Sequence, residues 1–214
     1  MKKVALQKIM FKLQGHISRS IAIACSGGVD SMVIADFLSN NHDVTLLYFN
    51  HGTTTGDAAQ AFLEQHAHDN NLKLRIGEID DPRAPKGKST EEHWRKERYK
   101  WLDEQAQHLG TEIVTGHHLD DCVETWIWSS LHGTGKIVPY RRKQVIRPFR
   151  LNRKEQFYKW AEKYSIDFIE DPSNTNTKYM RNYVRHELMP HALQVNPGLH
   201  KVVRKKVLTE VGDK

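Results

Sequence analysis

A chain of 214 residues can form one domain with a substantial buried core, and its 38% hydrophobic and 27% charged residues exclude an intrinsically disordered protein. The formal net charge of +6 favours a polyanionic partner, since each lysine or arginine beside a phosphate gains Coulomb energy and releases counterions; the alternative is a basic but merely solvated surface. The two cysteines, Cys25 and Cys122, form no CxxC pair, which excludes a zinc ribbon or a three-cysteine iron–sulfur site.

The pattern of apolar residues predicts alternating strands and helices. The N-terminus is too polar for a signal peptide and no apolar run has membrane-spanning length, so we expect a cytoplasmic protein with no membrane partner. By residue range, the expected elements are an amphipathic helix (4–14), a buried strand (20–25), a helix (30–40), a strand (44–49), a helix (57–71), a more exposed strand (72–79), a helix (89–109), a strand (112–116), a helix (120–131), a short strand ending at 146 and a helix (152–164). Ser89 with Glu92, and Asn152 with Glu155, have capping-box spacing at the start of two of these helices.

This order of elements predicts an α/β fold with a doubly wound, mostly parallel sheet and helices on both faces. Ligands of such sheets bind beyond the carboxyl ends of the strands. No strand is predicted after about residue 170, so we expect a catalytic domain over residues 1–170 and a basic loop with a small helical extension over 171–214.

A glycine-rich loop, Ser26-Gly27-Gly28-Val29-Asp30-Ser31, follows the first strand and opens a helix. Glycines let the backbone approach phosphate oxygens, and successive N–H groups at a helix N-terminus bind anions. Ser26 and Ser31 add hydroxyl donors. Asp30 would repel phosphate unless it holds a cation, so we interpret it as a Mg²⁺ ligand. The competing interpretation is a plain helix cap in a glycine turn.

The loop resembles the SGGxDS signature of the N-type ATP pyrophosphatases, or PP-loop ATPases, which cleave ATP to AMP and pyrophosphate on a Rossmann-like fold. Other segments resemble the tRNA(Ile)-lysidine synthetases within that superfamily. These segments are Asn50-His51-Gly52, Glu91 with Arg95, Arg98 and Tyr99, the run from His117 to Thr125, Arg147-Pro148-Phe149, Asp171-Pro172-Ser173-Asn174, and Arg181-Asn182 with Arg185. The resemblance covers roughly residues 20–197 and implies ATP, Mg²⁺, tRNA and lysine as ligands.

The expected catalytic residues follow from these segments. Asp121 and Glu124 lie three apart on one helical face, a spacing that suits Mg²⁺ binding, proton transfer or an ammonium group, and the resemblance assigns them to the lysine substrate. Arg181 is expected to hold the carboxylate of lysine. His117 is expected at the phosphate or the base intermediate, and the resemblance implies that the adenosine of ATP lies near His51.

Arginines in several segments of the chain are expected to bind RNA. Arg95 and Arg98 share a helical face with Tyr99, which suits phosphates and a flipped base, although ion pairing with Glu91 is the alternative. The stretch 136–163 holds ten lysines and arginines, and core packing is expected for most of the aromatic rings in and around it. The RNA-binding arginines are therefore expected to be Arg95, Arg98, Arg141, Arg142 and Arg185, with Arg95 also catalytic.

Three departures from the family pattern concern the RNA substrate. Trp94 replaces a small residue, His132-Gly133-Thr134-Gly135 replaces R-G-x-G before a shortened basic segment, and only basic helices stand where full-length members carry further C-terminal parts. Cys122 is interpreted as a packing residue, not a thiolase nucleophile.

The reaction implied by the resemblance is adenylation of the C2 carbonyl of a cytidine, at the wobble position of tRNA(Ile), followed by attack of lysine to give lysidine. The oligomeric state is expected to be a monomer or homodimer. The alternatives are another RNA modifier of the superfamily, such as a thiolase, and an RNA-binding protein with a regulatory ATP site.

Overall fold

The computed structural model of the protein describes residues 10–172 and 176–212. The strands are β1 (Ser20–Ala24), β2 (Asp43–Asn50), β3 (Lys73–Glu78), β4 (Ile113–Thr115), β5 (Arg141–Arg142) and β6 (Val145–Ile146). The helices are α1 (Val29–Ser39), α2 (Thr54–Asp69), α3 (Thr90–Leu109), α4 (Leu119–Leu131), α5 (Lys154–Tyr164), α6 (Met180–Tyr183), the π-helical turn η2 (Val184–Leu188), α7 (Met189–Val195) and α8 (Leu199–Gly212).

The strands form one sheet in the order β3-β2-β1-β4-β6-β5, parallel throughout except for the β5–β6 pair. This arrangement confirms the predicted α/β fold with a mostly parallel sheet. β1 lies between β2 and β4, and its residue Ile23 pairs with Leu46 on one side and Val114 on the other. Such a central strand is buried on both faces, which explains its continuous apolar sequence.

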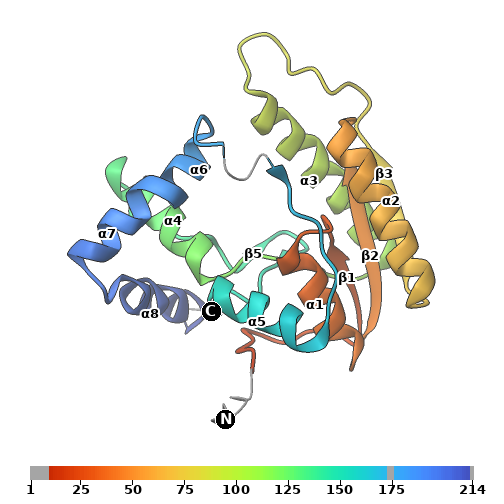
Figure 1. The fold of residues 1–214 in the computed structure, drawn as a ribbon, viewed down its shortest axis with the longest axis horizontal. Coiled ribbons are helices and arrows are strands. Elements are labelled where there is room, and N and C mark those ends of the chain that lie inside the picture. The colour runs from red at the N-terminus through yellow and green to blue at the C-terminus, as the bar shows by residue number, and fades with distance from the viewer. Residues whose placement is uncertain (1–9, 173–175, 213–214) are drawn as a thin grey trace, which may run out of the picture.

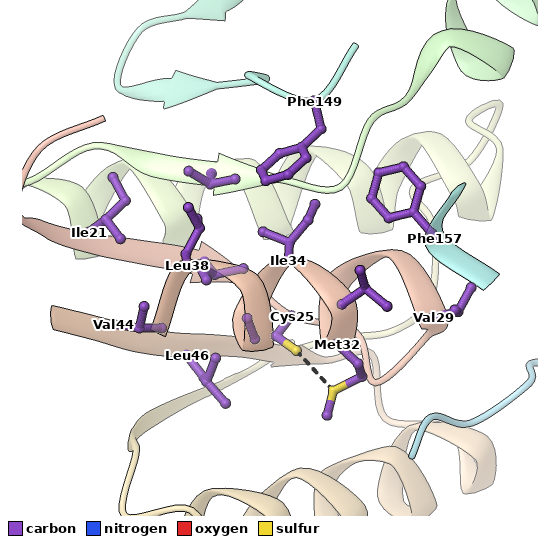
Figure 2. Close-up of a cluster of buried hydrophobic side chains, with 14 of the residues drawn as sticks. Ile21, Cys25, Val29, Met32, Ile34, Leu38, Val44, Leu46, Phe149 and Phe157 are labelled. Carbon is purple, nitrogen blue, oxygen red and sulfur yellow. Dashed lines mark hydrogen bonds between the residues drawn. The ribbon is translucent and has the colours of Figure 1, made fainter. Parts of the chain in front are cut away.

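Helices cover both faces of the sheet. On one face, α1, α2 and α5 contribute to the cluster drawn in part in Figure 2, where Ile34 lies among the rings of Phe149 and Phe157. On the other face, Tyr99, Leu102 and Ala106 of α3 pack against residues of β1, β2, β4 and β6. Each fully buried large apolar side chain contributes about 1.5–3 kcal/mol, so both layers are strongly held to the sheet.

The C-terminal helices pack on α4. Leu199, Val203 and Val207 of α8 form a third apolar cluster with α4 residues that include Cys122. Figure 1 shows α7 and α8 beside α4, on the opposite side of the molecule from α2 and β3. This packing holds the C-terminal helices against α4. No helix in the described part of the chain is both long and apolar enough to cross a membrane.

Two local predictions are wrong. Residues 10–14 of the expected N-terminal helix are not helical, because Lys12 and Gln14 bond through their N–H groups to Asn152 Oδ1 and the Pro148 carbonyl; the rest of that prediction lies outside the described residues. Asn152 is consequently unavailable as a cap, and α5 begins one residue later with Gln156 Oε1 accepting from the Arg153 N–H at 2.8 Å. The Ser89 cap is confirmed, with its hydroxyl accepting from Glu92 N–H at 3.1 Å.

The aromatic residues around the basic stretch are mostly packed, as expected. Phe149, Phe157 and Trp160 are buried in the core, and Trp126 and Tyr140 pack against it while partly exposed. Trp128 and Tyr158 are the exceptions, with exposed rings.

Candidate active site

The glycine-rich loop lies at the carboxyl end of β1, where it turns into α1. Gly27 has φ +80°, a left-handed conformation that favours glycine, and its carbonyl accepts from the Ile169 N–H at 2.9 Å. A Cβ on Gly27 would lie 2.9 Å from Cδ1 of Ile169. Backbone conformation and close packing therefore both require glycine at this position.

The two serines of the loop have different surroundings. The Ser31 hydroxyl donates to the Gly28 carbonyl at 2.9 Å and accepts from the Ser26 N–H at 3.2 Å, so it braces the loop from inside. Ser26 is exposed. Gly28 is the N-cap of α1 and has no side chain to satisfy the first N–H groups of that helix. Those free donors and the helix dipole suit an anion.

Asp30 lies at the meeting point of three segments. Its Oδ2 accepts from Lys154 Nζ at 2.7 Å, and its Oδ1 lies 3.9 Å from Nε2 of His118. A Cβ on Gly116 would lie 3.1 Å from Cβ of Asp30, so glycine lets the end of β4 approach α1. Within the described residues, Oδ1 of Asp30 is buried without a hydrogen-bond partner. An unpaired carboxylate oxygen of this kind fits a cation or a donor from a ligand.

At the end of β2, His51 is covered by an aromatic ring. The rings of His51 and Trp94 stack, with centroids 5.1 Å apart and an interplanar angle of 13°. Trp94 Nε1 donates to the Pro82 carbonyl at 2.8 Å, which fixes the ring in place. Burial lowers the pKa of His51 to about 4, and the charge of Arg98 adds to the shift. His51 is therefore neutral at physiological pH.

The end of β4 places two histidines at the same edge of the sheet. Burial lowers the pKa of His117 to about 3, and its Nδ1 lies 3.0 Å from the Thr115 hydroxyl. His118 is the N-cap of α4: its Nδ1 accepts from the Asp121 N–H at 3.3 Å, and its own N–H donates to Asp121 Oδ2 at 2.8 Å. The reciprocal cap places the Asp121 carboxylate at the N-terminus of α4.

Asp121 and Glu124 form an acid–arginine cluster with Arg181 and Arg185. Asp121 and Glu124 are 4% and 3% exposed, and both arginines reach them from α6 and η2. Arg181 Nη2 lies 2.7 Å from Asp121 Oδ1 and its Nε lies 3.5 Å from Glu124 Oε2. Arg185 Nε lies 2.6 Å from Glu124 Oε1 and its Nη2 lies 3.3 Å from Asp121 Oδ1. Every oxygen of the two carboxylates consequently has a donor from the protein.

The electrostatics of this cluster keep Asp121 and Arg181 charged. Burial alone would raise the pKa of Asp121, but its interactions with His118 and Arg181 hold the pKa well below its usual range. The pKa of Arg181 is raised, chiefly by the charge of Asp121. The two acids and two arginines together carry no net charge, which compensates for much of the cost of burial.

Four arginines surround Tyr99, and we call Arg95, Arg98, Arg142 and Arg147 the Tyr99 arginine group. Cζ atoms of Arg95, Arg98 and Arg142 lie 4.9, 5.9 and 4.1 Å from the centroid of the Tyr99 ring. Arg147 is 2% exposed and donates from Nη2 to the Tyr99 hydroxyl at 3.1 Å. Arg141 is not part of this group, because it pairs with Glu112 just before β4.

A sequence profile of the PP-loop domain matches residues 2–192. The chain belongs to the PP-loop domain family. It is 28% identical over 200 residues to tRNA(Ile)-lysidine synthase of Thermotoga maritima, covering 87% of this chain and 48% of that protein. It is 31% identical over 208 residues to tRNA(Ile)-lysidine synthase of Francisella philomiragia, covering 92% of this chain and 52% of that protein. The chain thus spans about half the length of the curated relatives it matches.

Solved structures share the fold of this PP-loop domain. The U34-tRNA thiolase NcsA from Methanococcus maripaludis superimposes with a TM-score of 0.71 at 16% identity, covering 94% of this chain and 74% of that chain. NMN synthetase from Francisella tularensis superimposes with a TM-score of 0.56 at 11% identity, covering 91% of this chain and 87% of that chain. At these identities the likeness concerns the fold alone.

Sequence reasoning missed three contacts at the PP-loop edge. Lys154 lies 124 positions from its partner Asp30, so no spacing in the sequence signals the pair. Asp120 accepts from His200 Nε2 at 3.0 Å and from the Lys154 N–H at 2.8 Å, and thereby ties α8 and α5 to the start of α4. The only signal for Asp120 was its place in the His117–Thr125 run, which did not reveal this anchoring role.

The surroundings of Cys122 agree with a packing role. It is fully buried between α4 and α8, and burial raises the pKa of its thiol to about 12. Cys25 is also buried, with Sγ 3.6 Å from Sδ of Met32 (Figure 2). A thiol protonated at neutral pH and closed to solvent is a poor nucleophile.

Proposed function

We propose that this PP-loop domain catalyses an ATP-dependent modification of tRNA of the tRNA(Ile)-lysidine synthase type. ATP adenylates the C2 carbonyl of a wobble cytidine, pyrophosphate leaves, and the ε-amine of lysine then displaces AMP. The observation that carries the proposal is the pair of buried carboxylates, Asp121 and Glu124, at the same edge of the sheet as the glycine-rich loop. The names and sequences of the curated relatives support it.

In the first step, the backbone donors at the start of α1 would hold the phosphates of ATP, and the Lys154 ammonium would lie beside them. Mg²⁺ fits the unpaired Oδ1 of Asp30, and when bound it would neutralise charge that builds up on the phosphates. The described residues contain no group of three or more acidic, histidine or cysteine side chains arranged for a metal. Asp30 would therefore hold the ion together with ATP oxygens and water.

Neutral His51 and the Trp94 ring would border the adenosine. His51 directly follows β2 and so lies at the sheet edge where ligands of such sheets bind. Neutral His117 adds no positive charge, and its ring would contact the phosphate or the adenylated base. The charges of the surrounding arginines would stabilise the pentacoordinate phosphoryl group, so positioning and electrostatics supply most of the catalysis.

In the second step, Asp121 and Glu124 would attract the α-ammonium of lysine and Arg181 would bind the α-carboxylate, since both groups sit on one carbon. The ε-ammonium would then remain free to lose a proton to solvent and attack C2 as the neutral amine, with AMP as the leaving group. Because the pKa of Asp121 is held low, this carboxylate binds by charge and does not take a proton at neutral pH. Both acids already bond to arginines, so lysine must displace part of the Arg181 and Arg185 contacts.

The partners in this proposal are tRNA and free lysine, and the location is the cytoplasm. Arg95, Arg98, Arg142 and Arg185 are the proposed RNA contacts. Arg141 is not a proposed RNA contact, because Glu112 neutralises it. A thiolase is disfavoured by the buried, protonated Cys122.

The deciding experiment measures AMP and pyrophosphate release from labelled ATP with tRNA and lysine omitted in turn. We expect pyrophosphate release to require tRNA, AMP release to require lysine as well, and labelled lysine to enter the RNA. Glu124→Gln should keep tRNA-dependent ATP consumption and lose lysine incorporation, because it changes only the amine site. If ATP is consumed with tRNA but lysine never enters the RNA, the amine donor is wrong. If tRNA binds and no AMP forms under any combination, the chain is an RNA-binding protein with a regulatory ATP site.

A further inference from the structure

Three consecutive basic residues at β5 have different partners. Arg141 pairs with Glu112, and Lys143 Nζ lies 2.6 Å from Asp103 Oδ2. Arg142, between them, has no carboxylate within ion-pair distance in the described part of the chain, and its guanidinium lies over the Tyr99 ring. Arg141 and Lys143 are thus neutralised by ion pairs, whereas the charge of Arg142 remains available to bind an anion.

Arg142 lies beside the other positively charged side chains of the Tyr99 arginine group. In residues 10–172 and 176–212, no carboxylate pairs with any member of the Tyr99 arginine group. Buried Arg147 even has an Nε atom with no hydrogen-bond partner. Burial would raise the pKa of Tyr99, but the charges of Arg147, Arg95 and Arg98 outweigh burial and lower it. Like charges gathered without an ion-paired carboxylate repel one another, so an anion that joins them gains more than it would at an isolated arginine.

We propose that Arg142, with Arg95 and Arg98 around Tyr99, forms a phosphate-binding subsite separate from the glycine-rich loop. Planar guanidiniums bind phosphate oxygens in bidentate geometry, and stacking on Tyr99 holds them in position. The side chains of Arg95 and Arg142 are exposed, so the backbone of a large RNA can reach them. The assignment of a tRNA phosphate to this subsite rests on the proposed function; a phosphate of ATP is the other source of the same chemistry.

The test compares Arg142→Ala with the matched control Arg141→Ala, which removes an equal charge from the adjacent residue. Binding of unfractionated tRNA is measured without ATP over a range of salt concentrations. Arg142→Ala should weaken binding on the order of tenfold, the loss of one charged hydrogen-bonded contact. The slope of log K against log salt should fall by about one, as expected for one phosphate contact. Arg141→Ala should stay within about twofold of wild type, as expected for an exposed, paired charge.

A conservative variant checks the geometry of the subsite. Arg142→Lys should restore the salt slope and only part of the affinity, because an ammonium keeps the charge but lacks the planar stacked fork. Thermal unfolding of all three variants should match wild type, since both side chains are exposed. Equal losses for Arg141→Ala and Arg142→Ala would overturn the proposal, because the basic run would then act as a diffuse charge.

A second measurement identifies the source of the phosphate. If tRNA affinity is unchanged in Arg142→Ala while the inhibition constant of inorganic pyrophosphate rises, the subsite holds ATP-derived phosphate. If neither quantity changes, the subsite does not exist. If wild type releases no AMP yet its tRNA affinity depends on Arg142, the proposed reaction fails and the subsite stands.

Discussion

The glycine-rich loop and the acid–arginine cluster lie at the same edge of the sheet but are held together differently. In the loop, the hydrogen bonds of Ser31 join residues three and five positions apart. In the cluster, Arg181 and Arg185 reach acids 57 to 64 positions away, and the Arg181 side chain is 45% exposed. The first region is therefore braced by local hydrogen bonds, to which Lys154 and Ile169 add contacts from distant segments, whereas the second depends on distant partners that can be exchanged. This difference suggests a preformed nucleotide site and an amine site that opens for its substrate.

The substitution with the largest expected effect on the glycine-rich loop is Asp30→Asn. The substitution keeps the shape and removes the charge proposed to hold Mg²⁺, so tRNA-dependent AMP release should fall about 100-fold or more, the usual cost of losing a preorganised charge. Chelation of divalent cations should have the same effect on wild type and should be reversed by Mg²⁺. Release within a few-fold of wild type would show that Asp30 is not the ligand.

Gly27→Ala tests the backbone of the same region through stability. The φ of +80° and the approach of Ile169 should together lower the free energy of unfolding by about 2–4 kcal/mol, from strain and overpacking. Gly87→Ala is the matched control, because Gly87 has φ +82° with nothing within 4 Å of an added Cβ and should lose only the strain contribution. Urea unfolding measures both. Equal losses would mean that packing against Ile169 is unimportant.

In the acid–arginine cluster, Arg185→Ala should lower the KM for lysine several-fold, on the order of 1 kcal/mol. The substitution frees Glu124 Oε1 from a charge that competes with the substrate. Lys178→Ala, which removes an exposed charge from the segment before α6, should leave that KM unchanged. A rise in the KM for lysine would instead show that Arg185 helps to bind the substrate.

The two neutral histidines predict a pH effect on stability. Because the pKa of His117 is about 3 and that of His51 about 4 in the folded chain, the unfolded chain binds more protons below its ordinary histidine pKa of about 6.5. The free energy of unfolding should therefore fall as pH drops from about 6.5 toward 4, by at most about 1.4 kcal/mol per pH unit for each histidine. Denaturant unfolding across this pH range should show that the free energy of unfolding of His117→Asn depends less steeply on pH than that of wild type. An unchanged slope would mean that His117 is accessible to protons.

The smallest expected effect is that of Cys122→Ser. The thiol is buried and its pKa is raised to about 12, so tRNA-dependent AMP release should stay within about twofold of wild type. A modest loss of stability is expected from burying a hydroxyl among α4 and α8. Loss of the modification reaction in a variant that still folds would revive the thiolase alternative.

Local patterns in the sequence were enough to predict most elements of this PP-loop domain. The apolar run of β1, the loop at residues 26–31 and the Ser89 cap each depend on neighbours a few positions apart. The prediction of a helix over residues 4–14 is wrong for residues 10–14, because the structure of this segment depends on partners that are distant in the sequence. Lys12 and Gln14 bond to the segment 148–152, and no pattern of apolar residues reports on such a distant partner.

The sequence by itself therefore determined the parallel α/β sheet and the place of the anion-binding loop, because both follow from short-range periodicity and glycine chemistry. Tertiary structure alone decided how the charges are paired. It joined Lys154 to Asp30, placed Arg181 and Arg185 on the acids of α4, and neutralised Arg141 while leaving Arg142 over Tyr99. Coulomb interactions depend on distance in space and on burial, and neither quantity can be read from the order of residues along the chain.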